Sequence, residues 1–562
     1  MSDYSEIVII GSGFGGAVMA ARLGAHVKAR FGDSVRVEVV EKGGDHTAAF
    51  DPTAKGPPLN AQGNRFRHTY DLRYLAGLTD VFTDIDGAFR AGVPSFNVLA
   101  GKGIGGGSNV YAGVSLRAPA EIFAEQQDGR PLWPKRYSRA ALAPHYDSVA
   151  KTLHVNRLRW TDKDVPHWQL CTKRDLVFAE GCRRVGITAL PVPLASENDA
   201  NEGWWTQGQR FSGRQNLSQN YLAQAKAAGV RFSANVEVQR IEPFEKGYLV
   251  RGVDSRGGAQ KPFERACKIV IVAAGAIAST GLLLRSRPHF QGARELDAPL
   301  ARGAAEGILG KRVSGNGDYG VSGRIADAHA EAVESHKGKP IASFCPSLWK
   351  QHKVLILPFH ADPLYLALGQ ISTLLRADRP QAAGRASARA ALGADGRQER
   401  HWGAAYKARL SRFSERVLSM GCLAVDENEG EITLGPSGAP QVRWRETSVR
   451  TERRWNAALD AMRRIYEALG GEMYLDGYRK DGTVNTSHPL GGARMAEDGR
   501  YGVVGDDGQA FGNRNLFVVD GSVIPSALGV NPSMTIAAVA ESIAARLITG
   551  DGTESLEARL AA

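Results

Sequence analysis

The stretch Glu6-Ile7-Val8-Ile9-Ile10-Gly11-Ser12-Gly13-Phe14-Gly15-Gly16 decides the fold of this chain. Its four consecutive aliphatic residues predict a short buried strand, and the segment Ala17 to Leu23 that follows the glycines predicts a helix. A second segment, Val35 to Val40, has valine at four of its six positions; it predicts the next strand, which ends at Glu41. Together these segments predict a β-α-β unit whose glycine loop binds the phosphates of a dinucleotide at the helix N-terminus.

Each glycine of this pattern has its own predicted role. Gly11 permits a tight turn, Gly13 lets a pyrophosphate approach the backbone, and Gly16 lets helix and strand pack closely. Glu41 stands where an acid can accept both ribose hydroxyls, and its charge disfavours a 2′-phosphate.

Composition limits the remaining classes of protein. The 562 residues are 43% hydrophobic and 23% charged, which is typical of a soluble globular chain and excludes disordered, collagen-like and coiled-coil proteins. The five cysteines are too few and too scattered for a disulfide framework, and none forms a C-x-x-C pair. We therefore expect neither structural disulfides nor a metal site.

The sequence predicts a cytoplasmic protein. Residues 1–6 contain neither a basic nor an apolar leader segment before the first strand. Two uncharged stretches, residues 269–284 and 521–540, are interrupted by glycine, serine or proline. Both predict a strand or turn followed by a helix, not a membrane span.

The basic charge is concentrated in one segment. The chain has a net charge of +11, and residues 376–416 alone hold ten Lys or Arg against four Asp or Glu. No nucleic-acid motif accompanies them, so we expect no nucleic-acid partner. A basic insertion near 376–417, predicted to be helical from residue 381, is interpreted either as a solvated face or as a surface for peripheral membrane contact or an acidic partner.

Further elements follow from local patterns. Residues 230–237 and 247–253 alternate like strands, and residues 340–375 look β-rich. Ile269 to Ala273 predicts a buried strand that leads through Gly275 into a helix over Ser279 to Ser286. Residues 450–469 predict an amphipathic helix whose apolar stripe is the set Trp455, Leu459, Met462 and Ile465.

Three later motifs suggest chemistry. Gly105-Gly106-Gly107-Ser108 offers bare backbone against which a flat or anionic ligand can lie. His488 stands before Pro489-Leu490-Gly491-Gly492, a setting that leaves the imidazole few rotamers. Asn531 precedes Pro532, which begins the last long helix and leaves free N–H groups near residues 533–535.

These motifs occur in the order found in the glucose–methanol–choline (GMC) flavin oxidoreductases, which the chain resembles over nearly its whole length. Within that family the resemblance is strongest to the bacterial cholesterol oxidases with non-covalent FAD. It implies an α/β fold in which a Rossmann-like FAD-binding domain is interleaved with an α+β substrate-binding domain built on a mixed sheet with covering helices. The expected FAD-binding parts are residues 1–50, 95–125, 210–315 and 470–550, and the expected substrate-binding parts are 51–94, 126–209 and 316–469.

The resemblance also implies site residues. His488 and Asn531 would face the flavin and the substrate hydroxyl, the imidazole taking the hydroxyl proton and the amide holding the oxygen while the flavin accepts a hydride. The implied cofactor contacts run from the pyrophosphate through the ribose and the adenine to the flavin: Gly11, Gly13, Phe14, Gly15, Gly16, Glu41, Gly105, Gly106, Gly107, Ser108, Tyr111, Val238, Gly275, Asp520, Gly521, Pro532 and Ser533.

The expected activity is oxidation of a bulky apolar alcohol (sterol-like, terpenoid, aryl or long-chain), with oxygen or another electron acceptor. A dehydrogenase that uses a quinone or carrier protein, a flavoprotein or photo-enzyme without alcohol turnover, and a nicotinamide-dependent enzyme are the alternatives. The loop 101–112 holds no histidine or cysteine that could tether the flavin, which favours non-covalent FAD. Residues 354–360, where the resemblance would place an isomerising glutamate, contain none.

Overall fold

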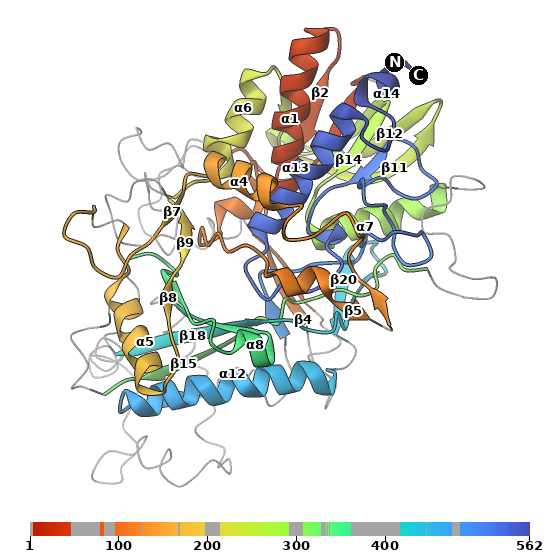
Figure 1. Ribbon diagram of the computed structural model, residues 1–562. Helices are drawn as coiled ribbons and strands as arrows, with labels where there is room; N and C mark the ends of the chain where they lie inside the picture. The colour runs from red at the N-terminus through yellow and green to blue at the C-terminus, as the bar shows by residue number, and fades with distance from the viewer. Residues whose placement is uncertain are drawn as a thin grey trace.

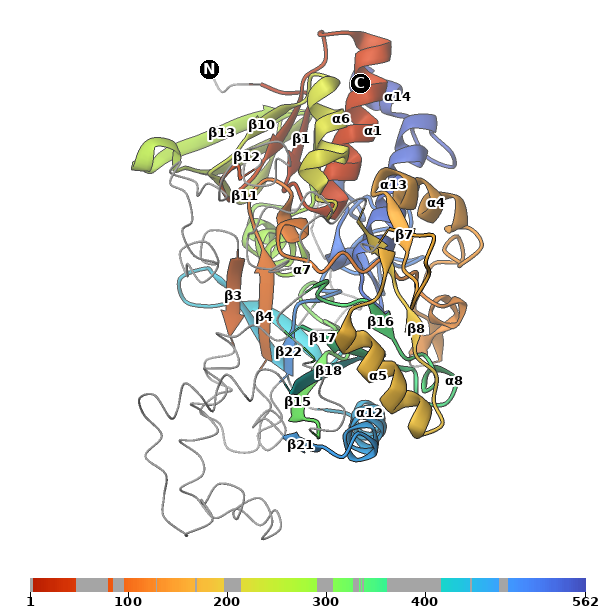
Figure 2. The same cartoon turned by 90° about the vertical axis from the view of Figure 1, so that its left-hand side faces the viewer.

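The computed structural model describes residues 4–46, 79–83, 96–127, 129–166, 169–196, 214–290, 307–326, 333, 335, 338–360, 416–444, 447–474 and 484–562. These residues form two layers, one around a parallel sheet and one around an antiparallel sheet (Figures 1 and 2). Both termini lie at the end of the molecule that holds the parallel sheet.

The parallel sheet has the strand order β10 (Arg231–Ser233), β2 (Val37–Val40), β1 (Ile7–Ile10), β14 (Ile269–Val272) and β23 (Leu516–Val518). Its three central strands are buried at every position, as expected for aliphatic runs in a sheet that is covered on both faces. The helix α1 (Phe14–Phe31) packs against both α6 (Tyr221–Ala227) and α13 (Ser533–Thr549) beside it (Figure 1). The predicted α/β fold is confirmed.

One predicted strand is wrong. The alternating run 230–237 is divided between β10 in the parallel sheet and β11 (Val236–Phe244), which pairs with β12 (Gly247–Asp254) and β13 (Lys261–Cys267) in a separate antiparallel sheet. The chain turns at Asn235, whose φ is +58°, a left-handed conformation that asparagine tolerates better than most residues. The helix α1 is longer at both ends than predicted, since it begins directly after Gly13.

The second layer is built on a sheet of β17 (Val354–Phe359), β18 (Val417–Ala424), β15 (Tyr319–Arg324) and β21 (Glu472–Tyr474), whose described strands pair antiparallel throughout. The helix α12 (Val449–Ala468) packs across it and contacts α5 (Lys173–Arg184) (Figure 1). The predicted apolar stripe of α12 is buried, which confirms the amphipathic helix.

A small sheet of β3 (Thr79–Thr83), β4 (Phe96–Gly101) and β22 (Val484–Thr486) lies between the two layers (Figure 2). Because β4 leads into the second glycine cluster and β22 leads into His488, this sheet brings both motifs to the boundary between the layers. The remaining elements that the text uses are η2 (Gly106–Asn109), α7 (Ala276–Ser286), α8 (Trp349–His352), β19 (Gly430–Leu434), β20 (Pro440–Trp444) and η10 (Gly521–Val523).

Two predicted segments lie partly or largely outside the described residues. The basic segment lies outside the described residues except for Arg416 and Val417, and Val417 begins β18 instead of ending a helix. Residues 361–375 of the predicted β-rich region also lie outside them. None of the described helices has both the length and the apolar character that a membrane-crossing segment needs. The domain boundaries and the cytoplasmic location stay predictions.

Candidate active site

The glycines of the first loop face two different surroundings. A Cβ atom on Gly11 would lie 2.4 Å from the carbonyl oxygen of Ala273, and one on Gly15 would lie 1.6 Å from that of Val519. A Cβ on Gly16 would meet the carbonyl oxygen of Gly11 at 2.0 Å. A Cβ on Gly13 would have no described atom within 4 Å. Three of the glycines are thus needed for backbone packing, and Gly13 faces open space at the start of α1.

The second glycine cluster lies directly against the first. A Cβ on Gly106 would be 2.8 Å from the Cα atom of Gly13, and the N–H of Gly105 donates to Ser12 Oγ at 3.0 Å. Ser108 is fully buried, and its hydroxyl donates to the carbonyl of Gly105 at 2.7 Å. Like Gly13, Gly107 has no described atom within 4 Å of an added Cβ. The two glycine loops therefore form one continuous backbone surface, and the space in front of Gly13 and Gly107 is open.

Glu41 is buried next to the two glycine loops and joins them by hydrogen bonds. Its Oε2 atom accepts from the backbone N–H and the hydroxyl of Ser12, at 3.1 and 2.7 Å. Its Oε1 atom accepts from the N–H groups of Gly43 and Gly103, at 2.9 and 3.2 Å. Burial raises the pKa of Glu41, while these hydrogen bonds oppose the rise. About four acceptor positions are available on a carboxylate, so protein donors already occupy the predicted ribose ligand.

Asp520, like Glu41, is a buried carboxylate that accepts four hydrogen bonds from protein groups. Its carboxylate accepts from the N–H of Gly275 at 2.8 Å, from the Ser279 hydroxyl at 2.5 Å, and from the N–H and hydroxyl of Ser522 at 2.8 and 2.6 Å. Burial raises its pKa. Gly275 has φ +90° and open space before an added Cβ. Asp520 thus fixes the start of α7, and Gly275 adds a third open glycine position.

The other predicted contacts surround the same region. The rings of Phe14 and Tyr111 meet edge to face with centroids 5.4 Å apart, and the Tyr111 hydroxyl donates to the carbonyl of Gln215. Val238 is buried in β11, next to a shift in strand register. The carbonyl of Gly521 accepts from the N–H of Gly491 at 2.9 Å, which ties η10 to the turn after His488.

His488 and Asn531 lie together, as the resemblance implies. The Nδ2 atom of Asn531 is 3.2 Å from Nε2 of His488, although the two residues come from different segments, one after β22 and one before α13. Asn531 is 8% exposed, and its Oδ1 atom is buried with no hydrogen-bond partner in the described part of the chain. Pro532 caps α13 and Ser533 begins it, so the amide stands at a helix N-terminus.

The sequence interpretation missed Asp318. Its Oδ1 and Oδ2 atoms lie 2.9 and 2.8 Å from Nδ1 of His488, on the side of the ring opposite Asn531. Because a carboxylate only accepts hydrogen bonds, this contact places a proton on Nδ1 and leaves Nε2 with a lone pair in the neutral ring. Such a ring can accept a proton from a hydroxyl group at Nε2. The Asn531 amide, 3.2 Å away, can bind the oxygen of that hydroxyl group.

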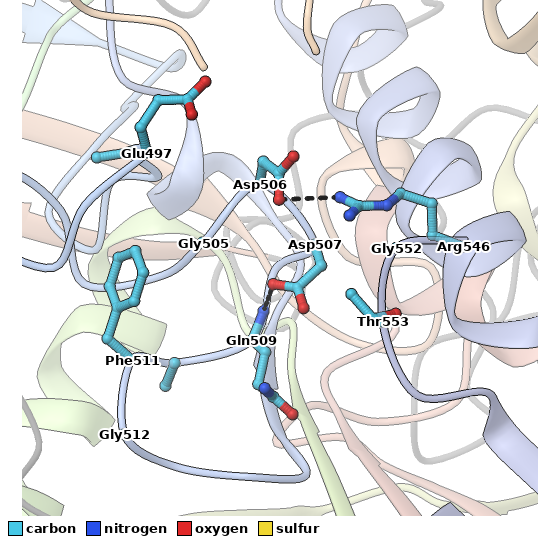
Figure 3. A pocket seen from close by; sticks show the side chains of 12 residues that line it. Glu497, Gly505, Asp506, Asp507, Gln509, Phe511, Gly512, Arg546, Gly552 and Thr553 are labelled. Carbon is cyan, nitrogen blue, oxygen red and sulfur yellow. Dashed lines mark hydrogen bonds and ion pairs between the residues drawn. The ribbon is translucent and has the colours of Figure 1, made fainter. Parts of the chain in front are cut away.

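Two cavities border the described residues. One of about 360 Å³ is lined by Val530, the neighbour of Asn531, and mainly by apolar side chains that include Leu116, Phe344, Trp349 and Leu355. The other, of about 310 Å³, holds three carboxylates near the end of α13 and contains none of the predicted site residues (Figure 3). One of these carboxylates, Asp506, is paired with Arg546 at 3.1 Å. Neither cavity is lined by a predicted site residue, but the first reaches Val530, the residue before Asn531.

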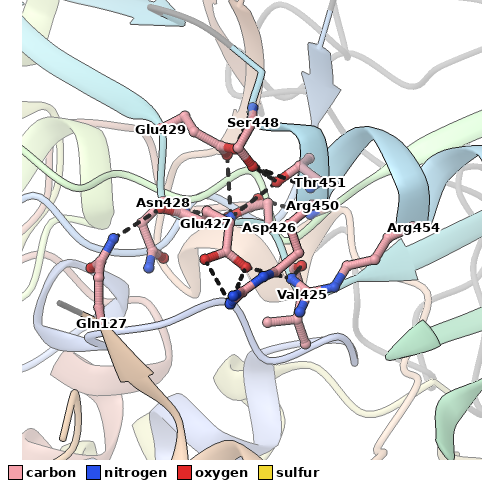
Figure 4. Close-up of polar contacts among 11 residues, drawn as sticks. Gln127, Val425, Asp426, Glu427, Asn428, Glu429, Ser448, Arg450, Thr451 and Arg454 are labelled. Carbon is pink, nitrogen blue, oxygen red and sulfur yellow. Dashed lines mark hydrogen bonds and ion pairs between the residues drawn. The ribbon is translucent and has the colours of Figure 1, made fainter. Parts of the chain in front are cut away.

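A buried carboxylate, Asp426, contacts the residue that precedes Asp318. Asp426 accepts from the N–H groups of Gly317 and Asn428, each at 3.0 Å, and lies in a polar cluster with Glu427 and Glu429 (Figure 4). Burial and the negative charge of Glu429 raise the pKa of Asp426 to about 7. In the unfolded chain this carboxyl would titrate near pH 4.

This raised pKa predicts a pH dependence of stability. Because folded Asp426 keeps a proton that the unfolded chain releases, its contribution is fully present below about pH 4 and is lost as the pH rises through about 7. In the variant Asp426→Asn this dependence should disappear. The unfolding free energy of the variant relative to the parent protein should rise by at least about 1 kcal/mol between pH 4 and 7. Denaturant titrations across that range measure it, and a constant difference would contradict the assignment.

Comparisons with known proteins identify the family of this chain. The GMC oxidoreductase family models match residues 7–288 and 426–540. A cholesterol oxidase of Mycobacterium tuberculosis is 26% identical over 96% of this chain and 90% of its own length. A long-chain-alcohol oxidase of Arabidopsis thaliana is 23% identical over 97% of this chain and 67% of its own length.

Solved structures show the same fold. A fungal aryl-alcohol oxidase superposes with a TM-score of 0.60 at 18% identity, covering 98% of this chain and all of that one. Pyridoxine 4-oxidase from Mesorbium loti gives a TM-score of 0.59 at 17% identity, covering 96% of this chain and 99% of that one. Since the N-terminal family model alone matches half of the sequence and the C-terminal model includes His488 and Asn531, the chain belongs to the GMC oxidoreductases and is an enzyme of that family.

Proposed function

We propose that this enzyme uses non-covalently bound FAD to oxidise a bulky, apolar alcohol to its carbonyl compound. The observation that carries the proposal is the pair His488 and Asn531: the amide nitrogen of Asn531 lies 3.2 Å from the imidazole Nε2, and its buried amide oxygen has no partner among the described residues. A buried acceptor without a partner is costly, which is why such an atom commonly receives a ligand group or water. A water molecule or a donor group of a ligand would satisfy Asn531 Oδ1, while its Nδ2 can donate to the oxygen of an alcohol whose proton points to His488.

The residues of the two glycine loops fit FAD. GMC oxidoreductases are flavoproteins that typically carry FAD. The three open positions, Gly13, Gly107 and Gly275, lie where bare backbone can approach a pyrophosphate and a flat ring system, and the N-terminus of α1 favours phosphate. When bound, FAD supplies the group that accepts a hydride from the alcohol.

Binding of the ribose requires a rearrangement at Glu41. Since all four donors to its carboxylate come from the protein, a ribose hydroxyl must replace one of them. The Ser12 hydroxyl is the donor best able to leave, because the carbonyl oxygen of Gly103 lies 3.3 Å away as an alternative acceptor. We propose that Ser12 turns to Gly103 and that Glu41 then accepts from the ribose.

His488 and Asn531 act on the hydroxyl group of the alcohol. Oxidation of an alcohol removes a proton from the oxygen and a hydride from the carbon. His488 Nε2 accepts the proton, while Asn531 holds the oxygen so that the C–H bond is oriented toward the hydride acceptor. The imidazolium that results lies beside the carboxylate of Asp318, which accepts from Nδ1.

The cavity beside Val530 supports an apolar substrate. Its walls are mainly aliphatic and aromatic, so it disfavours a sugar and accommodates a hydrocarbon chain or ring. The similar proteins named for long-chain alcohols, cholesterol and aryl alcohols share an apolar alcohol as substrate. The strand β17 contains no acid, so we propose that a sterol, if accepted, is oxidised without double-bond isomerisation.

A substrate screen tests this function. Purified protein should be yellow and should reduce its flavin with a sterol, a terpenol, an aryl alcohol or a long-chain alcohol, but not with glucose. Oxygen consumption, repeated with dichlorophenolindophenol as acceptor, separates an oxidase from a dehydrogenase. A colourless protein that binds nicotinamide dinucleotide, or a yellow protein that none of these alcohols reduces, would contradict the proposal.

A further inference from the structure

One short turn of the second layer contacts both members of the candidate catalytic pair. Asn316, Gly317 and Asp318, here called the 316–318 turn, immediately precede β15. The first two residues have left-handed φ angles of +56° and +61°. Asparagine and glycine are the residues that adopt this conformation at least cost, so the sequence suits the turn.

At one end of the turn, Asp318 holds the segment of His488. Besides its contact with Nδ1, the Oδ2 atom accepts from the hydroxyl of Thr486 at 2.8 Å and from the N–H of Ser487 at 3.2 Å. The Asp318 side chain is 13% exposed. A single carboxylate therefore fixes both the end of β22 and the orientation of the imidazole.

At the other end, Asn316 holds the backbone before Asn531. Its side chain is fully buried, and its Oδ1 atom accepts from the N–H groups of Leu528 and Gly529 at 2.8 and 3.0 Å. Its Nδ2 atom donates to the carbonyl of Val530 at 2.8 Å. Three hydrogen bonds from one side chain thus place the residues that lead directly into the catalytic amide.

The turn itself is fixed by its surroundings. The N–H of Gly317 donates to Asp426 at 3.0 Å, and its carbonyl accepts from the indole of Trp455 at 3.1 Å. A Cβ on Gly317 would lie 2.4 Å from the carbonyl oxygen of Ala424, so the backbone fits closely against β18. Because the turn is fixed, it can fix the positions of His488 and of the backbone that precedes Asn531.

We propose that Asn316 and Asp318 are the positioning residues of the active site, and that the 316–318 turn sets the tautomer of His488 and the location of Asn531 together. This inference rests on the proposed function. Asp318 keeps the Nδ1 proton in place, so Nε2 keeps its lone pair, which accepts from Asn531 Nδ2 here and can receive the proton of an alcohol that enters between them. Asn316 places the amide at the distance from Nε2 at which both groups can contact one oxygen. Neither residue gains or loses an atom in the reaction.

The variant Asp318→Asn tests the first half. An amide can donate its own N–H to Nδ1, which moves the ring proton to Nε2 and removes the base. We expect flavin reduction by the alcohol to slow by about 100- to 10,000-fold while the flavin content stays unchanged. Asp318→Glu, which keeps a carboxylate, should recover part of the rate. Asp460→Asn, on the exposed face of α12, is the matched control and should behave like the parent protein.

Nitrogen NMR gives a readout that needs no turnover. In protein labelled on its 13 histidines, the signal of His488, assigned by its loss in His488→Ala, should report a proton on Nδ1. In Asp318→Asn that proton should move to Nε2. An Nε2-protonated ring in the parent protein, or an unchanged tautomer and rate in the variant, would overturn the inference. If no alcohol reduces the flavin, the proposed function fails, but the tautomer still tests the positioning role.

The variant Asn316→Asp tests the second half. It keeps an acceptor for Leu528 and Gly529 but loses the donor to Val530. We expect the apparent affinity for the alcohol to fall by about 5- to 30-fold, because a displaced Asn531 amide would lose its hydrogen bond to the alcohol, while the His488 tautomer stays the same. An unchanged affinity in a folded, flavin-replete variant would remove Asn316 from the proposal.

Discussion

Gly13→Val should give a folded protein that purifies without flavin. The backbone of Gly13 is extended, with φ −70° and ψ −165°, so valine can adopt it without strain. An added Cβ meets no described atom, and its branches extend into the open space in front of the two glycine loops. Under the proposed function that space holds the pyrophosphate. The predicted loss is of cofactor binding, not of the fold.

Gly15 provides the matched comparison two residues later. A Cβ there would lie 1.6 Å from the carbonyl oxygen of Val519, so Gly15→Ala should destabilise the protein with or without flavin. The ratio of flavin to protein absorbance and the circular dichroism spectrum measure the two effects. If Gly13→Val purifies fully yellow, or if it unfolds as Gly15→Ala does, the phosphates do not lie in front of Gly13.

The sequence could predict the β-α-β unit because all of its signals are local. The strand Ile7–Ile10, the glycines and the strand that ends before Glu41 are adjacent in the chain. The residues that crowd Gly11 and Gly15, Ala273 and Val519, are distant in sequence, but the glycine spacing that indicates them is local. The division of residues 230–237 into two strands was not predictable in this way. It depends on Asn235 and on backbone hydrogen bonds to Glu41 and Gly43, which are distant in sequence.

Asp318 could not be found for the same reason. It is 170 residues from His488, and an aspartate after Asn-Gly is an ordinary turn residue in a single sequence. Only the packing of β15 against β22 brings the carboxylate to the imidazole. Glu41 shows the opposite case, since its position was predicted but its four protein donors were not. Polar partners depend on tertiary contacts that the periodicity of one chain does not contain.

His488→Ala should retain FAD and lose most of the activity. The imidazole contacts Asp318 and Asn531 and none of the glycines of the two loops, so its removal should leave cofactor binding intact. We expect the rate of flavin reduction by a confirmed alcohol to fall by about 100- to 10,000-fold, the usual size of a general acid–base contribution. Anaerobic stopped-flow absorbance measures this rate, and a flavin-replete variant that reduces at the parent rate would exclude His488 as the base.

The double variant with Asn531→Ala tests whether the two groups act on one oxygen. Asn531→Ala alone should slow reduction by less than His488→Ala, because it removes a hydrogen bond and leaves the proton acceptor in place. Since the amide and the imidazole are 3.2 Å apart and share a partner, their effects should not be independent. The double variant should therefore lose less than the product of the two single factors. Independent factors that multiply in full would mean that the two side chains act on different atoms of the substrate, and Asn531 would then be excluded from holding the hydroxyl that His488 deprotonates.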